Sequence, residues 1–280
     1  MKKYMITGAQ GQLGTELSKL LHEKMLSFQG YGSTDLDITN RNLVFEKVNK
    51  LRPDVIFHCA AYTAVDDAED VGKKTNWKIN VDGTKNIIDA SKKYKAILVY
   101  VSTDYVFDGT NMGEYQTEDP TNPRNEYGKA KLAGENEVKT LLDTYYIIRT
   151  SWLFGKYGKN FVYTMLDLAN THETLKVVND QIGRPTWTRT LAEFMLYLVQ
   201  TGSKFGTYQL SNDNVCSWFE FANKILKNTH TKVFPIASDE YPQKAYRPRH
   251  SIMSLDKARN INFKIPSWQD ALDSFIKDIK

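Results

Sequence analysis

YMITGAQGQLG, residues 4–14, places a short apolar strand directly before a turn with glycine at positions 8, 11 and 14. A helix is predicted from about Gln12. Glycine permits a tight turn and lets backbone N–H groups approach a phosphate, while the following helix directs its positive end to the same group. A glycine-rich turn also serves purely structural purposes, but a strand before it and a helix after it favour dinucleotide binding.

Further apolar runs follow at intervals, and they do not alternate with polar residues. Such runs are typical of strands that are buried on both faces of a parallel sheet. Segments with apolar residues at helical spacing separate them. The alternation predicts an α/β fold, a doubly wound parallel (Rossmann) sheet with ligands at the carboxyl ends of its strands. The expected strands are 54–59, 96–102 and 145–150, and the expected helices are 42–51, 81–94 and 127–142.

The character of the sequence changes after about Ser151. Aromatic residues, short strands and isolated helices replace the regular alternation, with helices expected at 161–170, 190–200, 218–227 and from Ser267. We therefore expect residues 1–150 to form a dinucleotide-binding domain and residues 151–280 to form mainly a smaller α/β substrate-binding lobe. Part of about 175–202 is expected to return to the first domain.

Composition excludes several classes of partner. The chain has 280 residues, and 37 basic against 33 acidic side chains give a net charge of +4, too little to predict nucleic-acid binding. No stretch approaches the ~20 apolar residues of a membrane helix. Cys59 and Cys216 lie far apart and are expected to be buried, reduced thiols. The expected location is the cytoplasm, without a membrane or nucleic-acid partner.

Tyr127 and Lys131 are the candidate proton-transfer pair. Residues four apart share one face of a helix, so the phenol and the ammonium point the same way. A nearby ammonium favours phenolate and eases proton transfer through the phenol. A surface pair with no function is the alternative. The position of the pair argues against it, because the helix follows a strand that ends in Ser102-Thr103-Asp104, where a parallel sheet presents reactive groups.

Together these motifs resemble the extended short-chain dehydrogenase/reductase family, and within it the dTDP-4-dehydrorhamnose reductases. The GxxGxxG spacing is the one common in short-chain dehydrogenases, and the resemblance runs nearly end to end. The segments that carry it are GAQGQLG (8–14), DLDIT (35–39), RPDVIFHCAAYTAVDDAE (52–69), STDYVFDG (102–109), NEYGKAKLAGE (125–135), RTSWLFGKYGKNFVYTML (149–166), NDQIGRPT (179–186) and YRPRHSIMS (246–254).

The resemblance implies NADPH- or NADH-dependent reduction of the 4-keto group of a dTDP-6-deoxyhexulose to dTDP-L-rhamnose, for cell-surface polysaccharide synthesis. Tyr127 would donate the proton, Lys131 would hold the nicotinamide ribose, and Thr103 would hydrogen-bond the keto oxygen. The cofactor would also contact Gly8, Gly11, Gln12, Leu13, Gly14, Asp37, Ile38, Ala60, Ala61, Tyr62 and Thr63. The sugar nucleotide would contact Thr103, Asp104, Tyr105, Trp152 and Arg247.

Two of these residues have simpler interpretations. Trp152 could be a core residue, but its place just after a strand favours substrate contact. Arg247 could be a solvated loop charge, although a guanidinium suits a diphosphate. The turn after the second strand carries Ser33 and Thr34, and these residues favour neither NAD nor NADP. We therefore expect the protein to use both cofactors.

A metal is not expected. Some family members bind magnesium at a dimer interface through glutamates, and Glu16 matches the first of these positions. Arg189 stands where the second would align, and an arginine cannot be a cation ligand. The five histidines do not cluster either. We expect a monomer or a homodimer without a bridging metal.

Two other functions compete with the leading one. One is reduction of a different nucleotide-linked 4-keto-6-deoxyhexose. The other is a non-catalytic role like that of the regulatory subunit of methionine adenosyltransferase, which the resemblance also includes. Loss of the tyrosine or the lysine would favour the second alternative, but both residues are present.

Overall fold

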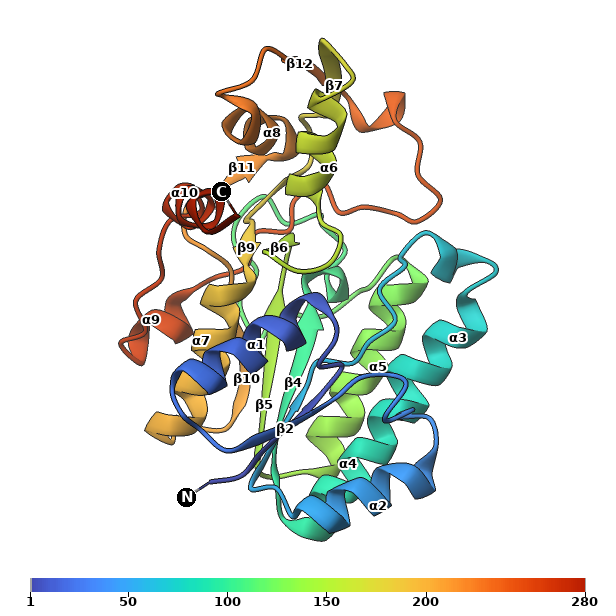
Figure 1. The fold of residues 1–280 in the computed structure, drawn as a ribbon. Helices are drawn as coiled ribbons and strands as arrows, with labels where there is room; N and C mark the ends of the chain where they lie inside the picture. Colours follow the sequence, from blue (N-terminus) through green and yellow to red (C-terminus); the bar gives the residue numbers. More distant parts are fainter. Residues whose placement is uncertain (1, 280) are drawn as a thin grey trace.

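The computed structural model describes residues 2–279, and its centre is a six-stranded sheet in the order β10-β5-β4-β3-β1-β2 (Figure 1). Every neighbouring pair is parallel. The chain order reverses between β1 and β3, which is where ligands bind in open parallel sheets. The strands are β1 (Tyr4–Thr7), β2 (Phe28–Tyr31), β3 (Val55–His58), β4 (Ile97–Thr103), β5 (Tyr145–Thr150) and β10 (Gly206–Gln209).

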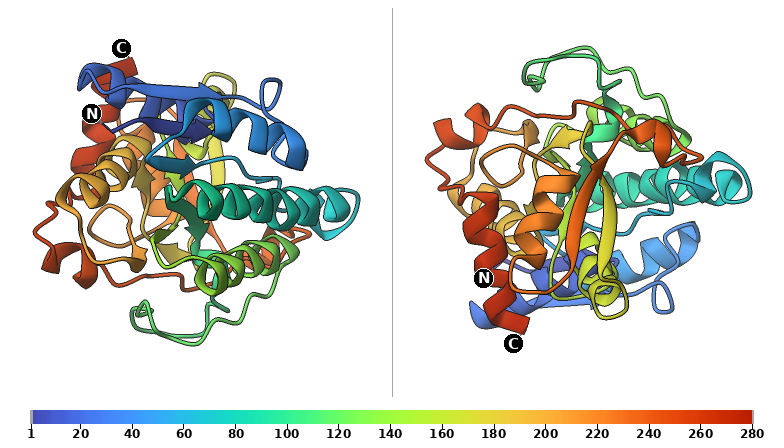
Figure 2. Two further views of the ribbon diagram at one scale, coloured as in Figure 1. Left: turned by 90° about the horizontal axis from the view of Figure 1, so that it is seen from below. Right: turned by 90° about the horizontal axis from the view of Figure 1, so that it is seen from above.

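Helices cover both faces of this sheet and account for the non-alternating strand sequences. Viewed from below, α4 and α5 lie on one side of the sheet and α7 on the other (Figure 2). All four residues of β1 and all four of β3 are buried, since each face meets an apolar helix layer. This confirms the predicted doubly wound α/β fold. One layer contains α2 (Arg41–Leu51), α4 (Thr84–Tyr94) and α5 (Glu126–Leu141), and the other contains α1 (Gln12–Glu23) and α7 (Thr188–Thr201).

The helix expected over 81–94 was predicted wrongly at its start. The helical segment begins at α3 (Lys73–Trp77), continues through a π-helical turn, η2 (Lys78–Gly83), and only then becomes α4. Asn76 and Asn80 are buried in this stretch and interrupt its apolar pattern. Polar residues in buried positions therefore concealed two turns of helix from a prediction based on hydrophobic spacing.

The second half of the chain builds a smaller lobe with its own core, which includes Phe154, Phe221 and Phe275. In it β7 (Thr174–Val178) pairs in parallel with β12 (Lys232–Ile236). Between these strands in the sequence, α7 and β10 lie on the large sheet instead. Separate cofactor and substrate domains over 1–150 and 151–280 remain a prediction.

The remaining helices of the second half are α6 (Phe161–Ala169), α8 (Trp218–Leu226), α9 (Asp256–Asn260) and α10 (Trp268–Ile279). Short strands are β6 (Leu153–Phe154), β8 (Ile182–Gly183), β9 (Thr186–Trp187) and β11 (Cys216–Ser217), and 3-10 turns are η1 (Asp67–Glu69), η3 (Asp104–Val106) and η4 (Ser238–Glu240).

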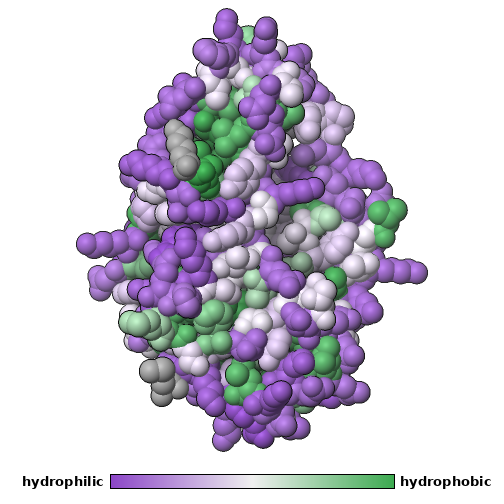
Figure 3. Space-filling model, viewed as in Figure 1, coloured by the Kyte–Doolittle hydropathy of each residue, from purple (hydrophilic) through white to green (hydrophobic). Residues whose placement is uncertain are grey.

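Hydrophilic residues cover most of the face seen in Figure 3, with an apolar area over the C-terminal lobe. Among the described residues 2–279, no helix has the length and apolar character needed to cross a membrane.

Candidate active site

The glycine turn is shaped by close backbone contacts. Gly8 has a φ of +67°, and a Cβ there would lie 2.6 Å from the backbone nitrogen of Ala60. At Gly11, by contrast, only the Gly8 carbonyl oxygen would lie within 4 Å of a Cβ. Within residues 2–279 no side chain caps α1, which begins after Gly11, so its first N–H groups remain for a ligand. The turn therefore has the open cradle and the free donors that a pyrophosphate requires.

A cavity of about 450 Å³ opens beside this turn. Its lining includes six of the residues predicted to contact the cofactor: Gly8, Gly11, Asp37, Ile38, Ala60 and Ala61. Ser33 at the end of β2 also lines it. The described residues thus fit a dinucleotide.

Other predicted cofactor residues are engaged within the protein. The Leu13 side chain is part of the core, so only its backbone can meet a phosphate. The Gln12 side chain donates to the Leu153 carbonyl at 3.4 Å and accepts from the Asn160 amide at 3.0 Å. Gln12 thereby joins the start of α1 to the C-terminal lobe. Gly14 packs closely against the Gly8 backbone, and Tyr62 and Thr63 follow Ala61 in the loop after β3.

Lys131 is held at the buried face of α5. The helix starts where the Asn125 side chain accepts a hydrogen bond from the Gly128 N–H at 2.7 Å. One turn further, Lys131 is 2% exposed, and its Nζ lies 4.0 Å from the centre of the Tyr100 ring. No carboxylate of residues 2–279 forms an ion pair with it. Burial lowers the pKa of Lys131 to about 7, although the nearby Glu135 opposes the shift.

Tyr127 lies one turn before Lys131 on α5, and its ring packs against the ring of Tyr105. The two rings meet edge to face, with centres 6.1 Å apart. Burial raises the pKa of Tyr127 above its usual range, and the nearby Asp104 and Tyr105 add to this, while a hydrogen bond with Thr103 lowers it. The phenol is therefore kept protonated, as a proton donor must be.

Thr103 and Asp104 lie where β4 ends. The Thr103 hydroxyl accepts from the Tyr105 N–H at 3.2 Å and donates to Oδ1 of Asp104 at 3.1 Å. Asp104 is 3% exposed, and within the described part of the chain its Oδ2 has no hydrogen-bond partner. Burial raises the pKa of this carboxyl to about 6. The Thr103 hydroxyl, the Asp104 carboxyl and the Tyr127 phenol thus lie together at the end of β4, and each of these groups can share a proton in a hydrogen bond.

A second cavity of about 450 Å³ lies against the C-terminal lobe. Its walls are largely apolar, with a few cationic and amide groups, which suits a nucleoside diphosphate. Aromatic walls come from Tyr105, Phe161 and Trp218, and polar groups from Lys176, Gln181 and Arg247.

Trp218 lines this cavity but was not among the predicted site residues. The segment from Trp218 was expected only as a helix over 218–227, and Ser217 and Glu220 do form a capping box at its start. Trp152, the predicted substrate residue, stacks on Trp218 with ring centres 3.7 Å apart. Only the tertiary packing joins these two tryptophans, so no local pattern could reveal the pair.

Arg247 lines the second cavity as well. Its Nη2 donates to Asp66 at 2.8 Å, and its guanidinium carbon lies 5.7 Å from the centre of the Tyr105 ring. Its Nη1 is buried, with no hydrogen-bond partner in residues 2–279. An arginine with one donor satisfied and another free can donate a hydrogen bond to an anionic oxygen.

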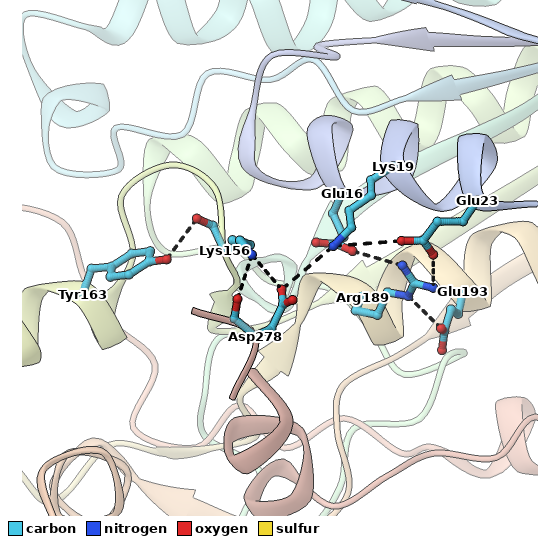
Figure 4. Close-up of polar contacts among 8 residues, drawn as sticks. All are labelled: Glu16, Lys19, Glu23, Lys156, Tyr163, Arg189, Glu193 and Asp278. Carbon is cyan, nitrogen blue, oxygen red and sulfur yellow. Dashed lines mark hydrogen bonds and ion pairs between the residues drawn. The ribbon is translucent and has the colours of Figure 1, made fainter. Parts of the chain in front are cut away.

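The two residues aligned with a family metal site form an ion cluster instead (Figure 4). The guanidinium nitrogens of Arg189 lie 3.5 Å from a carboxylate oxygen of the buried Glu16, 2.7 Å from one of Glu23 and 2.8 Å from one of Glu193. A guanidinium is a cation and has no lone pair for a metal, so these residues do not fit one. No group of three or more His, Cys, Asp or Glu side chains in residues 2–279 is placed to hold a metal ion.

Comparison with known proteins decides the family. The family model of the RmlD substrate binding domain matches residues 1–280. The chain belongs to this family. It is 38% identical to the dTDP-4-dehydrorhamnose reductase of Aggregatibacter actinomycetemcomitans, over 97% of each chain. It is 35% identical to the spore coat polysaccharide biosynthesis protein SpsK of Bacillus subtilis, over 99% of this chain and 98% of the relative.

A solved structure agrees with this assignment. The crystal structure of dTDP-4-dehydrorhamnose reductase from Bacillus anthracis in complex with NADP superposes with a TM-score of 0.95 at 42% identity and covers 99% of each chain. The RmlD-family chain described here therefore has the fold of a protein that was crystallised with a nicotinamide cofactor.

Proposed function

We propose that this RmlD-family protein is a dTDP-4-dehydrorhamnose reductase, which uses NADPH or NADH to convert dTDP-4-dehydro-β-L-rhamnose into dTDP-L-rhamnose. The observation that carries the proposal is that Tyr127 lies close to Thr103 at the end of β4, with the buried Lys131 one helical turn further along α5. Tyr127 packs on Tyr105, which lines the cavity of the lobe. Lys131 lies near Cys59, which lines the cavity at the glycine turn. The SpsK relative supports use of the product in polysaccharide synthesis.

The cofactor cavity would hold the dinucleotide through the glycine turn, Asp37 and the loop after β3. When bound, the nicotinamide supplies the hydride. Neither an arginine nor a carboxylate stands at Ser33 or Thr34 to discriminate a 2′-phosphate from a free hydroxyl. Both NADPH and NADH are therefore proposed as donors.

Tyr127 donates the proton that the keto oxygen needs. Its raised pKa keeps the phenol protonated until charge develops on the oxygen. The Thr103 hydroxyl orients the ketone by hydrogen bonding, and the ammonium of Lys131 stabilises the phenolate that remains. With a pKa of about 7, Lys131 can be cationic or neutral near neutral pH, the range in which a proton relay works best.

The lobe cavity would bind the nucleotide part of the substrate. Arg247, with its free Nη1, and Lys176 supply positive charge for the diphosphate. Phe161 and Trp218 supply apolar faces for the base. Asp104, Tyr105 and Trp152 remain the proposed contacts to the sugar.

Product analysis tests this function. The purified protein is mixed with enzymatically prepared dTDP-4-dehydro-β-L-rhamnose and NADPH, nicotinamide oxidation is followed by absorbance, and the product is characterised by NMR. The proposal expects dTDP-L-rhamnose. A different configuration at C4, or turnover only with another nucleotide sugar, would indicate the first alternative. Tight cofactor binding without turnover would indicate the non-catalytic one.

For assembly, we propose a monomer or a homodimer that needs no bridging metal, because Arg189 already neutralises the carboxylates around Glu16. We also propose a cytoplasmic location, since the reaction consumes NAD(P)H and a nucleotide sugar, both of which are produced inside cells.

A further inference from the structure

Two buried asparagines, Asn76 and Asn80, lie between the cofactor loop and the helix of Tyr127. Asn76 is in α3 and Asn80 is in the π-helical turn η2, and their exposed fractions are 0% and 1%. Buried amides are costly unless each polar atom finds a partner. Their partners therefore indicate what these side chains hold in place.

Asn80 clamps the backbone of the cofactor loop. Its Oδ1 accepts from the Tyr62 N–H at 3.1 Å, and its Nδ2 donates to the Tyr62 carbonyl at 3.0 Å. The preceding residue, Ala61, lines the cofactor cavity. Any shift of this loop when a dinucleotide enters would consequently act directly on the Asn80 amide.

Asn76 continues the connection to the proton donor. Asn80 donates to Oδ1 of Asn76 at 2.7 Å, and Nδ2 of Asn76 donates to the Glu126 carbonyl at 2.9 Å. That carbonyl belongs to the peptide group that joins Glu126 to Tyr127. The backbone of Glu126 is also fixed through its N–H group, which donates to the Glu69 carboxylate at 2.8 Å.

The local helix geometry explains how the two amides meet. Residues four apart share a face of a helix, which places the amides in contact. The widened turn η2 contains Asn80, and π-helical turns occur often at functional sites. Both Nδ2 hydrogens of Asn80 are used, one for the loop and one for Asn76. The amide chain is thus continuous from Tyr62 to the peptide group before Tyr127.

We propose that Asn76 and Asn80 are positioning residues that couple the loop Ala60–Thr63 to the peptide group before Tyr127, so that cofactor binding aligns the phenol. This inference rests on the proposed reductase function. A merely structural pair would stabilise the fold without linking cofactor binding to the position of Tyr127. The two possibilities differ in their effects on kcat and on local hydrogen exchange.

The test uses the full-length variants Asn76→Ala, Asn80→Ala and the double variant. Asn76→Ala should lower kcat about 10- to 100-fold, because small misplacements of a reacting group are costly, while NADPH affinity stays within about twofold. Asn80→Ala should lower kcat similarly and also weaken NADPH binding. Because both residues belong to one connection, the double variant should have a kcat no lower than that of Asn80→Ala.

Asn212→Ala is the matched control. Asn212 is also fully buried, and its side chain hydrogen-bonds the Trp187 N–H, Thr190 and the Pro266 carbonyl, none of which lines either cavity. It should lower the melting temperature but leave kcat unchanged. If Asn76→Ala is too unstable, Asn76→Ser replaces it, because its hydroxyl is too short to reach the Glu126 carbonyl.

Amide hydrogen exchange supplies a readout that does not need turnover. In the wild type, NADPH should slow exchange in residues 60–63 and in residues 126–130. In Asn76→Ala, the first protection should remain and the second should decrease. Wild-type kcat and unchanged protection in Asn76→Ala would overturn the coupling, as would an equal loss of kcat in Asn212→Ala. An inactive wild type would refute the proposed function, while the exchange data would still decide the coupling.

Discussion

The two faces of the sheet differ in whether their buried charged side chains have ion-pair partners. On the α5 face, Lys131 is buried without an ion-pair partner in residues 2–279, and Asp104 keeps one oxygen unbonded. On the α1–α7 face, Arg189 contacts three carboxylates, and the cluster extends through Lys19 and Asp278 to α10 (Figure 4). An unpaired buried polar group costs about 1–3 kcal/mol, so folding alone does not favour it.

This difference distinguishes the charged residues that are available to a ligand from those that stabilise the fold. Groups that remain unpaired can act on a ligand, whereas paired groups hold elements together. The α5 face also contains a fully buried ion pair close to Lys131. Arg149 donates two hydrogen bonds to the Glu135 carboxylate, at 2.8 and 2.9 Å. Lys131 therefore lies beside a satisfied pair while remaining unpaired itself.

The largest expected effect comes from Lys131→Met. Loss of the ammonium should lower kcat about 100-fold or more and weaken NADPH binding, because the phenolate and the ribose both lose a partner. Lys129→Met is the control on the same helix, since Lys129 is half-exposed and, among residues 2–279, forms an ion pair only with Glu126. Steady-state kinetics and a fluorescence titration measure the two effects. Unchanged NADPH affinity would restrict Lys131 to an electrostatic role.

Stability should depend on pH because of the same residue. Lys131 has a pKa of about 7 in the folded protein and a higher one when unfolded, so between these values the unfolded chain binds more protons. The free energy of unfolding should therefore rise with pH from about 7 to 9, by at most about 1.4 kcal/mol per pH unit. Urea denaturation should show that Lys131→Met lacks this contribution. Identical pH profiles for the two proteins would contradict the unpaired burial of Lys131.

Arg189→Ala probes the opposite face. It should lower the free energy of unfolding by about 1–3 kcal/mol, because Glu16 would remain buried without its counter-charge. The kcat should stay within about twofold of wild type, because Arg189 contacts neither cavity. Denaturant titration and kinetics measure both. A large loss of kcat with unchanged stability would reverse the roles assigned to the two faces.

The smallest expected effect concerns metals. EDTA and magnesium should leave the melting temperature and the oligomeric state of the wild type unchanged, because a guanidinium stands among the carboxylates. Arg189→Glu, which would place four glutamates together, should become more stable when magnesium is added. Thermal shift and light scattering report these outcomes. A wild type that dissociates in EDTA would show that a metal does bridge two copies.

Local patterns predicted a large part of the fold. Strand β1, the glycine turn and the start of α1 lie within the eleven residues 4–14, and β5 has the predicted bounds. The place of Tyr127 and Lys131 one turn apart on α5 follows from helical spacing alone. These features were predictable because each depends on contacts between residues that are close in the sequence.

Features that depend on distant contacts were missed. Strand β10 has only four residues, and it is a strand because it pairs with β5. The lobe cavity combines Tyr105, Trp218 and Arg247, which are far apart in the chain. Asn76 and Asn80 were overlooked because a buried amide has no periodic signal, and only their hydrogen bonds reveal their position between the loop Ala60–Thr63 and α5.

Tyr127→Phe removes one hydroxyl and keeps the ring that packs on Tyr105, so it shows whether this phenol is the proton donor. We expect wild type to reduce dTDP-4-dehydro-β-L-rhamnose with NADPH, and Tyr127→Phe to bind NADPH equally well but turn over about 100-fold or more slowly. A Tyr127→Phe variant as active as wild type would contradict the assignment of Tyr127 as the proton donor.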